Sequence, residues 1–298
     1  MKYPFSKIII IFNPNSTGDS KSNAKNLQKK LTTELPKRVS VEVVPTKHAG
    51  HAFEIAKKHA ATKQKVLIVS SSGDGGYNEV VNGVLSLKNH KTTVCVLPSG
   101  NANDHYHSIS SRDITERIIS GETRKIDVLK IEGSVDGKKW SHYAHSYIGA
   151  GVTAYVGRKL TEADLNPVNE KWLVLKYLIK FGHISLKVTS WKHEKYYRYS
   201  SFVVGNIDRM SKVIKLDKDS SIKDGRFEVY AIRSRSFLSL IRVLVVASVA
   251  GKEISDKSKQ IKFISKSRLE IQCDGEVFDI DPNTKNVISI NKCYMRTI

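Results

Sequence analysis

The stretch that decides the fold is Val66-Leu67-Ile68-Val69-Ser70-Ser71-Ser72-Gly73-Asp74-Gly75-Gly76-Tyr77-Asn78-Glu79-Val80-Val81. Its first four residues form an apolar run that predicts a buried strand, and a helix is predicted from about Tyr77 to Leu87. Between them lies a turn rich in serine and glycine. A strand, a glycine turn and a helix aim backbone N–H groups and the helix N-terminus at one point outside a sheet, where an anion can bind. Asp74 would repel phosphate there, so its carboxylate indicates bound Mg²⁺ or acceptance of a proton from an attacking hydroxyl.

A second turn of the same kind follows the next predicted strand. Val94-Cys95-Val96-Leu97 is apolar, and Pro98-Ser99-Gly100-Asn101-Ala102-Asn103-Asp104 comes directly after it. A single Gly-Asp-Gly is most often only a tight connection between a strand and a helix. Two polar turns at the carboxyl ends of neighbouring strands are more informative, because ligands of open parallel sheets bind at those ends.

The two halves of the chain differ in their patterns. Strands predicted at 7–12, 39–44, 66–69 and 93–97 alternate with helices, which indicates a doubly wound, mostly parallel α/β sheet over residues 1–124. From residue 125 onward, runs with period two and the hairpin signal Asp136-Gly137 predict a β-rich, antiparallel, sandwich-like domain over residues 125–298. Helices are expected there near residues 154–160, 172–182 and 237–250, with a glycine-rich bend at 148–152 and a strand at 196–205.

Composition narrows the function classes. The 298 residues include 49 Lys or Arg against 29 Asp or Glu, a formal charge of +20, which favours polyanionic partners. The sequence has no signal peptide pattern, no membrane-spanning run and no nucleic-acid-binding module. Three cysteines without metal-ligand spacing predict buried, reduced thiols. The basic and aromatic stretch 171–198 predicts either an interfacial membrane-docking surface or ordinary solvated lysines.

Five ordered motifs carry a family resemblance. They are Ser72–Gly83 (SGDGGYNEVVNG), Leu97–Asp104 (LPSGNAND), Phe12–Gly18, Thr46–Ala52 and Asp274-Gly275-Glu276. Together they resemble the diacylglycerol kinase catalytic family, which includes sphingosine and ceramide kinases and bacterial soluble lipid kinases. The resemblance implies an ATP- and Mg²⁺-dependent kinase that phosphorylates a hydroxyl of a lipid, first diacylglycerol and next a sphingoid base. It also implies an active cleft between the two domains, with the last strand free to return to the first domain.

The resemblance places ATP contacts in the first domain, and two positions depart from the family pattern. Relatives usually carry threonine at the positions of Gly76 and Asn101, so this chain lacks two hydroxyls near the nucleotide. Most relatives carry glycine at the position of Ser72, and the resemblance implies that the sphingosine kinases share the serine. The implied ATP-binding residues are Asn13, Pro14, Thr46, Ser72, Gly73, Asp74, Gly75, Gly76, Asn78, Glu79, Gly100, Asn101, Asn103 and Asp104.

Three carboxylates are candidates for the catalytic base. The resemblance favours Glu276 as the proton acceptor with Asp274 beside it, and Asp74 is the third candidate. Without the resemblance, Asp274-Gly275-Glu276 would be interpreted as a solvated hairpin tip. Asp224-Gly225 resembles a structural Mg²⁺ site of the family, with carbonyls from about Ser221 and Arg226, and a plain turn before the next strand is the alternative.

Two other functions stay open from the sequence alone. An NAD kinase shares a Gly-Gly-Asp-Gly turn, although the 101–104 motif and the 274–276 hairpin argue against it. A degenerate member would bind nucleotide or anionic lipid without turnover. The expected location is the cytoplasm with peripheral contact to an anionic membrane surface, and a homodimer is left open.

Overall fold

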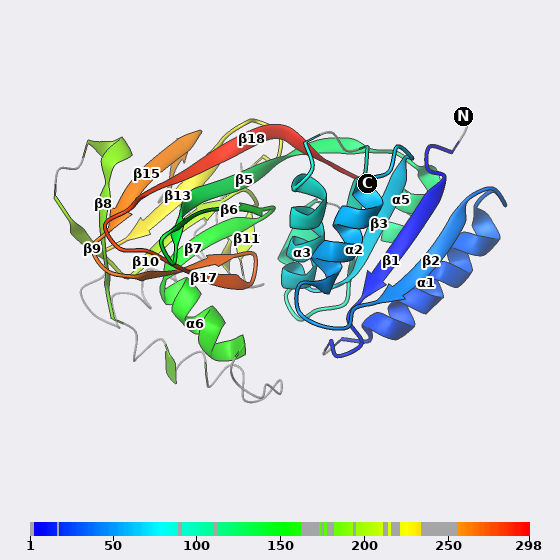
Figure 1. Ribbon diagram of the computed structural model, residues 1–298, viewed down its shortest axis with the longest axis horizontal. Helices are drawn as coiled ribbons and strands as arrows, with labels where there is room; N and C mark the ends of the chain where they lie inside the picture. The colour runs from blue at the N-terminus through cyan, green and yellow to red at the C-terminus, as the bar shows by residue number, and fades with distance from the viewer. Residues whose placement is uncertain are drawn as a thin grey trace. The chain divides into compact units, whose positions relative to one another are not determined.

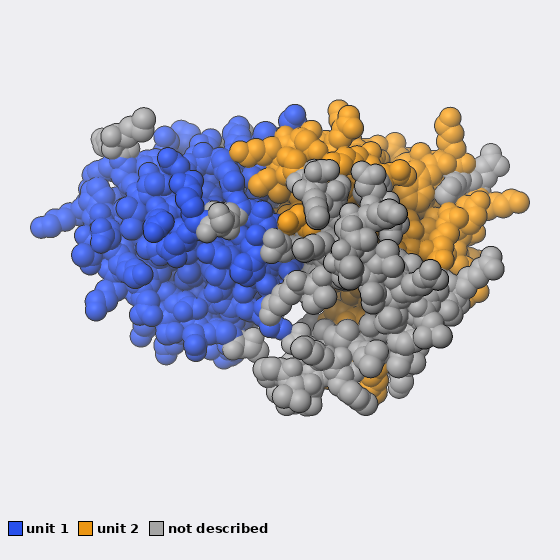
Figure 2. All heavy atoms as spheres, turned by 180° about the vertical axis from the view of Figure 1, so that it is seen from behind, with its two compact units in different colours: residues 1–127, 292–298 blue, residues 128–291 orange. Residues whose placement is uncertain are grey.

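The computed structural model describes residues 3–16, 18–88, 91–109, 112–161, 173, 176–177, 182–192, 195–210, 214–215, 221–233 and 255–298. The chain divides into two compact units. Unit 1 consists of residues 1–127 and 292–298, and unit 2 consists of residues 128–291 (Figure 2). Unit 1 is therefore assembled from two separate segments of the sequence.

Unit 1 is built on a parallel sheet. The neighbouring strands run in the order β2-β1-β3-β4-β18, and every pairing between them is parallel. Strands β1 and β3 are buried along nearly their whole length, as expected of parallel strands covered on both faces. The bounds are β1 Lys7–Phe12, β2 Ser40–Pro45, β3 Val66–Ser72, β4 Thr93–Pro98 and β18 Lys285–Thr297, of which the end from Lys292 belongs to unit 1.

Helices cover both faces of this sheet (Figure 1). Buried residues of α1 and α5, such as Leu27, Leu31 and Ile118, share a core with alternate residues of β1 and β3. Helices α2 and α3 pack against each other and against β3. The result is the doubly wound layering that alternating strands and helices predict. The bounds are α1 Ser20–Glu34, α2 His51–Ala60, α3 Asp74–Leu85, α4 Asp104–Ile109 and α5 Ile114–Ser120.

In unit 2 the strand pairings whose register is described are antiparallel. One six-stranded sheet has the order β14-β13-β10-β7-β16-β17. In a second group β5 pairs with β6, and the strands β18-β15-β8-β9 are neighbours in that order. The bounds are β5 Arg124–Val135, β6 Lys138–Ala144, β7 Tyr147–Gly151, α6 Val152–Thr161, β8 Ile184–Val188, the 3-10 turn Thr189–Trp191, β9 Tyr197–Tyr199, β10 Ser201–Gly205, β11 Arg209–Met210, β12 Ile214–Lys215, β13 Phe227–Ile232, β14 Ser255–Ser258, β15 Gln260–Ser265, β16 Leu269–Cys273 and β17 Glu276–Ile280.

One apolar core joins the two strand groups of unit 2. It contains Leu129 and Ile131 from β5, Phe263 from β15, and residues of the six-stranded sheet such as Phe202 and Ile271. Side chains of alternate residues from both groups meet there, as in a sandwich. The predicted fold class, a mostly parallel α/β part followed by an antiparallel β part, is confirmed.

Several element boundaries differ from the sequence prediction. Strand β3 extends through the serines to Ser72, and α3 begins at Asp74 rather than Tyr77, because Asp, Gly and Gly are tolerated in a first helical turn. Residues 148–151, predicted as a glycine-rich bend, belong to the fully buried strand β7. The strand predicted at 196–205 is broken at Ser200. Of the helix predicted at 172–182, the structure describes only residues 173, 176, 177 and 182, and the helix predicted at 237–250 lies outside the described residues.

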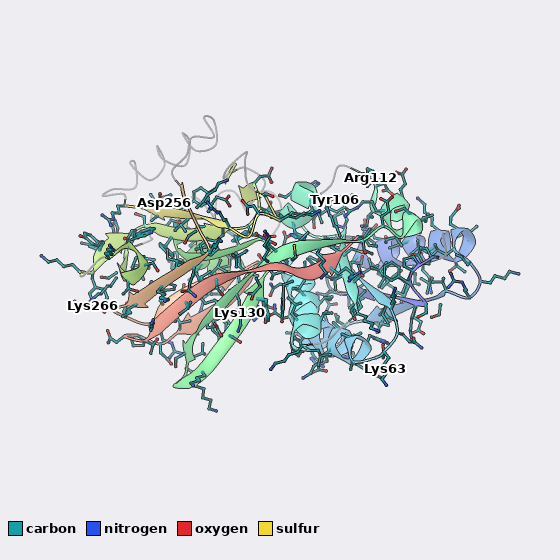
Figure 3. The ribbon with its side chains drawn as sticks, turned by 90° about the horizontal axis from the view of Figure 1, so that it is seen from above. Lys63, Tyr106, Arg112, Lys130, Asp256 and Lys266 are labelled. Carbon is teal, nitrogen blue, oxygen red and sulfur yellow. The ribbon has the colours of Figure 1, made fainter. Side chains whose placement is uncertain are left out.

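Many charged side chains lie at the surface, and two of the three thiols predicted to be buried are so: Cys95 and Cys273 are buried, whereas Cys293 is half-buried. Basic side chains such as Lys63, Arg112 and Lys266 are exposed (Figure 3). In the part of the chain that the structure describes, no helix is both long and apolar enough to cross a membrane. All three cysteines are free, and burial raises the pKa of the Cys95 thiol to about 12. Such a thiol stays protonated and is a poor nucleophile.

Candidate functional site

A pocket of about 320 Å³ lies in unit 1 where its parallel strands end. Segments that follow β1 and β2 supply part of its wall, and the end of β3 with the first turns of α3 supplies the rest. This is the position at which open parallel sheets bind ligands. The lining residues are Ile11, Phe12, Asn13, Pro14, Asn15, Thr46, Lys47, His48, Ala49, Ala52, Ser70, Ser72, Gly76 and Glu79.

The N-terminus of α3 lies at the pocket and offers backbone N–H groups to it. The helix begins at Asp74, so the N–H groups of Gly75 and Gly76 lie in its first turn. First-turn N–H groups have no partner within their own helix and carry the positive end of the helix dipole. They are suited to bind phosphate oxygens, and Gly76 lines the pocket.

Two glycines bring the two polar turns into backbone contact. A Cβ added to Gly100 would lie 2.3 Å from the Cα of Gly73, and a Cβ added to Gly73 would lie 3.2 Å from the Cα of Gly100. No real Cβ tolerates the first distance. Gly100 therefore needs to be glycine for the turns after β3 and β4 to pack together, and a side chain at Gly73 would be in tight contact.

Asp74 links the same two turns through hydrogen bonds. Its Oδ2 accepts from the backbone N–H of Asp104 at 3.0 Å, and its Oδ1 accepts from that of His105 at 3.2 Å. The carboxylate thus satisfies the first N–H groups of α4 from a different segment, in the manner of a helix cap.

Asn103 closes the second turn from within. Its backbone is left-handed, with φ of 52°, a conformation that asparagine tolerates better than most residues. Its Oδ1 accepts from the N–H of Gly100 at 3.1 Å, and its Nδ2 donates to the carbonyl of Gly100 at 2.8 Å. Both polar groups of this side chain therefore bond to the turn itself.

The hairpin of unit 2 separates its two carboxylates. Asp274, at φ of 49°, is fully buried and accepts from the backbone N–H groups of His145, Ser146 and Tyr147. His145 Nε2 lies 3.3 Å from Asp274 Oδ2. The Glu276 side chain keeps 30 % of its surface exposed, and its Oε2 lies 3.4 Å from Nε2 of His142. Glu276 is thus the more accessible acid of the pair.

Comparison with known proteins identifies the family. The diacylglycerol kinase catalytic domain matches residues 7–131. The diacylglycerol kinase of Bacillus subtilis (strain 168) is 30% identical over 249 residues, covering 76% of each chain. The chain belongs to the diacylglycerol kinase family. It is a lipid kinase of that family, and its enzymatic class is phosphotransferase.

Solved structures agree with the family's fold. A diacylglycerol kinase from Bacillus anthracis str. Sterne matches with a TM-score of 0.73 at 18% identity, covering 100% of this chain and 98% of that one. Yeast NADH kinase matches with a TM-score of 0.54 at 9% identity, covering 99% and 83%. At these identities the likeness concerns the fold, so the NADH kinase match does not carry an NAD kinase activity to this chain.

The departure from the family pattern at Gly76 has a steric cause. A Cβ at this position would lie 2.8 Å from the Cβ of Ser72 and 2.9 Å from its Oγ. Ser72 therefore fills the space next to residue 76, and both residues line the pocket. The Ser72 hydroxyl lies 2.8 Å from that of Ser70 and donates to the carbonyl of Gly73 at 3.0 Å. A hydroxyl is thus present beside the position where relatives of the diacylglycerol kinase family usually carry threonine.

The pocket includes some of the predicted nucleotide contacts and leaves others outside its lining. Glu79 is half-buried in the wall, whereas Asn78 is fully buried and accepts from Asn82 Nδ2 at 3.0 Å. The contacts assigned to ATP stay predictions at every position. Inside the lining are Asn13, Pro14, Thr46, Ser72, Gly76 and Glu79; outside it are Gly73, Asp74, Gly75, Asn78, Gly100, Asn101, Asn103 and Asp104.

Sequence reasoning missed four polar residues of the pocket wall. Asn15, Lys47, His48 and Ser70 line it but were not assigned a role. The signal was present, because Asn15, Lys47 and His48 lie inside the two family motifs at 12–18 and 46–52. The family resemblance assigns ATP contacts only to Asn13, Pro14 and Thr46 of those motifs.

Two places could hold a cation on chemical grounds. Asp224 Oδ1 accepts from the N–H of Arg226 at 2.9 Å, which is the hydrogen bond of a plain Asx turn before β13. The Mg²⁺ site assigned to Ser221, Asp224 and Arg226 therefore stays a prediction. The other place is a cluster of His48, His51 and Glu54, whose donor atoms lie within 4.8 Å of one another. There His51 Nδ1 already accepts from the N–H of Lys47 at 3.0 Å, so that nitrogen's lone pair is in use.

Proposed function

We propose that this chain transfers the γ-phosphate of ATP to a hydroxyl of a membrane-derived lipid, first diacylglycerol and next a sphingoid base. The observation that carries the proposal is the unit 1 pocket, where the first turn of α3 meets the ends of β1, β2 and β3. Phosphoryl transfer demands mainly positioning and neutralisation of charge, which N–H groups and oxygen donors in such a pocket supply.

In this proposal the pocket residues hold the nucleotide. The N–H groups of Gly75 and Gly76 bind phosphate oxygens, and the Ser72 hydroxyl takes the part of the threonine that is usual at position 76. Asp74 and the two turn glycines hold the second turn in register with the first.

Magnesium fits the donor set at the pocket. The Glu79 carboxylate and the Ser72 hydroxyl line it, and Asp74 lies in the adjacent turn; oxygen donors of these kinds are what Mg²⁺ prefers. When bound, the ion offsets the charge that develops on the phosphates. The side chains that would hold it are those of Glu79 and Asp74.

Glu276 is the proposed proton acceptor. The acceptor hydroxyl loses its proton to a Glu276 oxygen as its own oxygen forms the new bond to the γ-phosphorus. The bond from that phosphorus to the bridging oxygen breaks, and its electron pair leaves with ADP. Asp274 is fully buried and accepts three backbone hydrogen bonds, so its proposed part is to hold the hairpin that presents Glu276. The proposal requires donor and base to meet in one cleft during the reaction.

The basic surface and the aromatic residues of unit 2 support peripheral contact with an anionic membrane, where the lipid substrate resides. Tyr196 and Tyr197 are among the exposed large apolar side chains. The cytoplasm, where ATP is available, is the proposed location. Whether the protein forms a homodimer is measured by analytical ultracentrifugation of the sample used in the assay.

The test is phosphorylation of lipids from radiolabelled ATP in mixed micelles. Diacylglycerol, sphingosine and a total lipid extract are offered separately, with Glu276→Gln as the inactive variant and the exposed His183→Phe as the matched control. We expect labelled phosphatidic acid with the wild type and with the control, and loss of about hundredfold or more with Glu276→Gln. Nucleotide binding without any labelled lipid would support the degenerate binder, and NADP formation from NAD would support the NAD kinase; either result refutes the proposal.

A further inference from the structure

Two strands of unit 2 place four side chains in one cluster. Residues two apart on a strand point to the same face, so Trp140 and His142 of β6 share a face, and Glu276 and Phe278 of β17 share another. The two faces meet: the ring of His142 lies 4.6 Å from that of Phe278, and its Nε2 lies 3.4 Å from Glu276 Oε2.

The neighbouring aromatic rings pack against the imidazole of His142 and shield it from solvent. Trp140 lies parallel to His142 at 5.9 Å with an interplanar angle of 5°, and Trp140 contacts Phe278 at 4.8 Å. The His142 side chain retains only 12 % of its exposure. Burial lowers the pKa of His142 to about 4, so the ring is neutral near pH 7 and carries one N–H.

Asp279, the other carboxylate of β17, has a different partner and serves as an internal comparison. Asp279 accepts two hydrogen bonds from the guanidinium of Arg158, at 2.7 and 3.2 Å. The guanidinium binds Asp279 through two N–H groups and a full positive charge. The neutral imidazole beside Glu276 can orient its carboxylate through one N–H without adding a charge.

We propose that His142 is a positioning residue for the phosphoryl transfer, holding the Glu276 carboxylate through its Nε2–H in the orientation that accepts the substrate's proton. The inference rests on the proposed function, because it assigns a partner to the base of that reaction. His142 itself exchanges no proton with the substrate. It limits the rotamers of Glu276 and, with Trp140 and Phe278, excludes water from one side of the carboxylate.

Other charged groups near the pair have partners of their own. Asp274 accepts backbone hydrogen bonds and faces His145, and Asp279 lies on the opposite face of β17 from Glu276, bound to Arg158. On β5, which pairs with β6, Lys130 bonds to Glu132 at 2.7 Å. These contacts do not involve His142, so replacing His142 is not expected to break them.

The test compares two replacements of His142 by steady-state kinetics. His142→Phe keeps a ring but removes the N–H, and we expect kcat to fall by about tenfold to about hundredfold while KM for ATP stays within about twofold. His142→Gln offers an amide N–H and should recover most of kcat. The acidic limb of the kcat–pH profile should move to higher pH in His142→Phe and return in His142→Gln, because a lost donor raises the pKa of a carboxylate.

Three results would overturn the inference. One is a wild-type kcat in His142→Phe, another is an equal defect in both variants with an unmoved pH profile, and a third is a defect equal to that of the exposed control His183→Phe. Nitrogen NMR of the imidazole gives a readout that needs no activity: the neutral Nε2–H form near pH 7, with a resonance that shifts in Glu276→Gln. An inactive wild type that shows this contact refutes the proposed function, whereas an active wild type with unaffected His142 variants refutes this inference alone.

Discussion

The two aspartate turns of the molecule, at Asp74 and Asp274, share one feature: the aspartate carboxylate accepts backbone N–H groups from another segment of the chain. Asp74, half-buried at the start of α3, accepts two backbone N–H groups from the turn after β4. Asp274, fully buried at the tip of the β16–β17 hairpin, accepts three from the segment between β6 and β7. In both units an acid that looks catalytic in the sequence holds a second backbone segment. The difference is burial: Asp74 keeps part of its surface in contact with solvent, and Asp274 does not.

This comparison separates structural from chemical roles within each motif. At each turn a neighbour two residues away is better placed for chemistry: Ser72 lines the pocket beside the α3 N-terminus, and Glu276 is partly exposed beside His142. Replacing the buried aspartate should therefore affect mainly stability, and replacing the half-buried one mainly activity. The following predictions are ordered by their expected effect on the free energy of unfolding.

The largest effect is expected at Asp274. Asp274→Ala leaves three buried N–H groups without an acceptor, which should cost about 4 kcal/mol in the free energy of unfolding. Urea denaturation measures it, with Asp274→Asn as a variant that retains one acceptor oxygen and Glu276→Gln as the control. Wild-type stability in Asp274→Ala would show that the comparison between the turns is mistaken.

The second effect is a pH dependence due to His142. Its folded pKa of about 4 lies below the ordinary 6.5, so between these values the unfolded chain binds a proton that the folded chain does not. Stability should therefore fall as the pH drops from 6.5 toward 4, by at most about 3 kcal/mol from this residue. Urea denaturation at about pH 7 and about pH 4.5 should show a smaller difference in His142→Phe than in the wild type. Equal differences would contradict the prediction.

The third effect concerns the space shared by Ser72 and Gly76. Gly76→Thr places a Cβ within 2.9 Å of the Ser72 side chain and should destabilise the protein by about 2 kcal/mol. Ser72→Gly in the same chain should remove most of that cost, which a double-mutant cycle measures. If the proposed role of the Ser72 hydroxyl is right, the double variant also recovers the ATP affinity that Ser72→Gly loses. Additive stability effects would refute the steric coupling.

The smallest stability effect is expected at Asp74. Asp74→Ala removes a cap from α4 and should cost about 1 kcal/mol, the usual cost of losing a helix cap. Phosphate transfer should nevertheless fall by more than about hundredfold, since the turns after β3 and β4 lose their register. Urea denaturation and the micelle assay on the same sample separate the two effects. A large stability loss with retained specific activity would reverse the contrast with Asp274.

The sequence predicts the fold well because its patterns are local. Ile8–Ile11 and Val66–Val69 read as buried parallel strands, and Asp136-Gly137 reads as a two-residue hairpin turn, with φ of 48° and 74° as such a turn requires. The strand Tyr147–Gly151 was missed because three of its five positions are glycine or alanine, which carry little strand signal. The fully polar strand β14 was missed because the interpretation relied on apolar alternation.

The site was predicted less completely because its decisive contacts join distant residues. The motif glycines were identified, but the packing of Gly73 on Gly100 depends on the two turns meeting in space. Asp274 and Glu276 look alike in the sequence, and only the 145–147 segment, more than 120 residues away in the chain, distinguishes their environments. His142 carried no sequence signal, because its partner lies on another strand.

Strand β18 also sets an order of events during synthesis. Unit 1 contains residues 292–298, and Ile298 lies in the core with Leu27 and Ile118. A ribosome has therefore made all of unit 2 before the sheet of unit 1 can receive the strand that pairs with β4. Until then the edge of β4 is open to pairing with another chain, which exposes the nascent protein to aggregation. A translation product that stops before residue 292 would keep that open edge and become a substrate for chaperones and proteases.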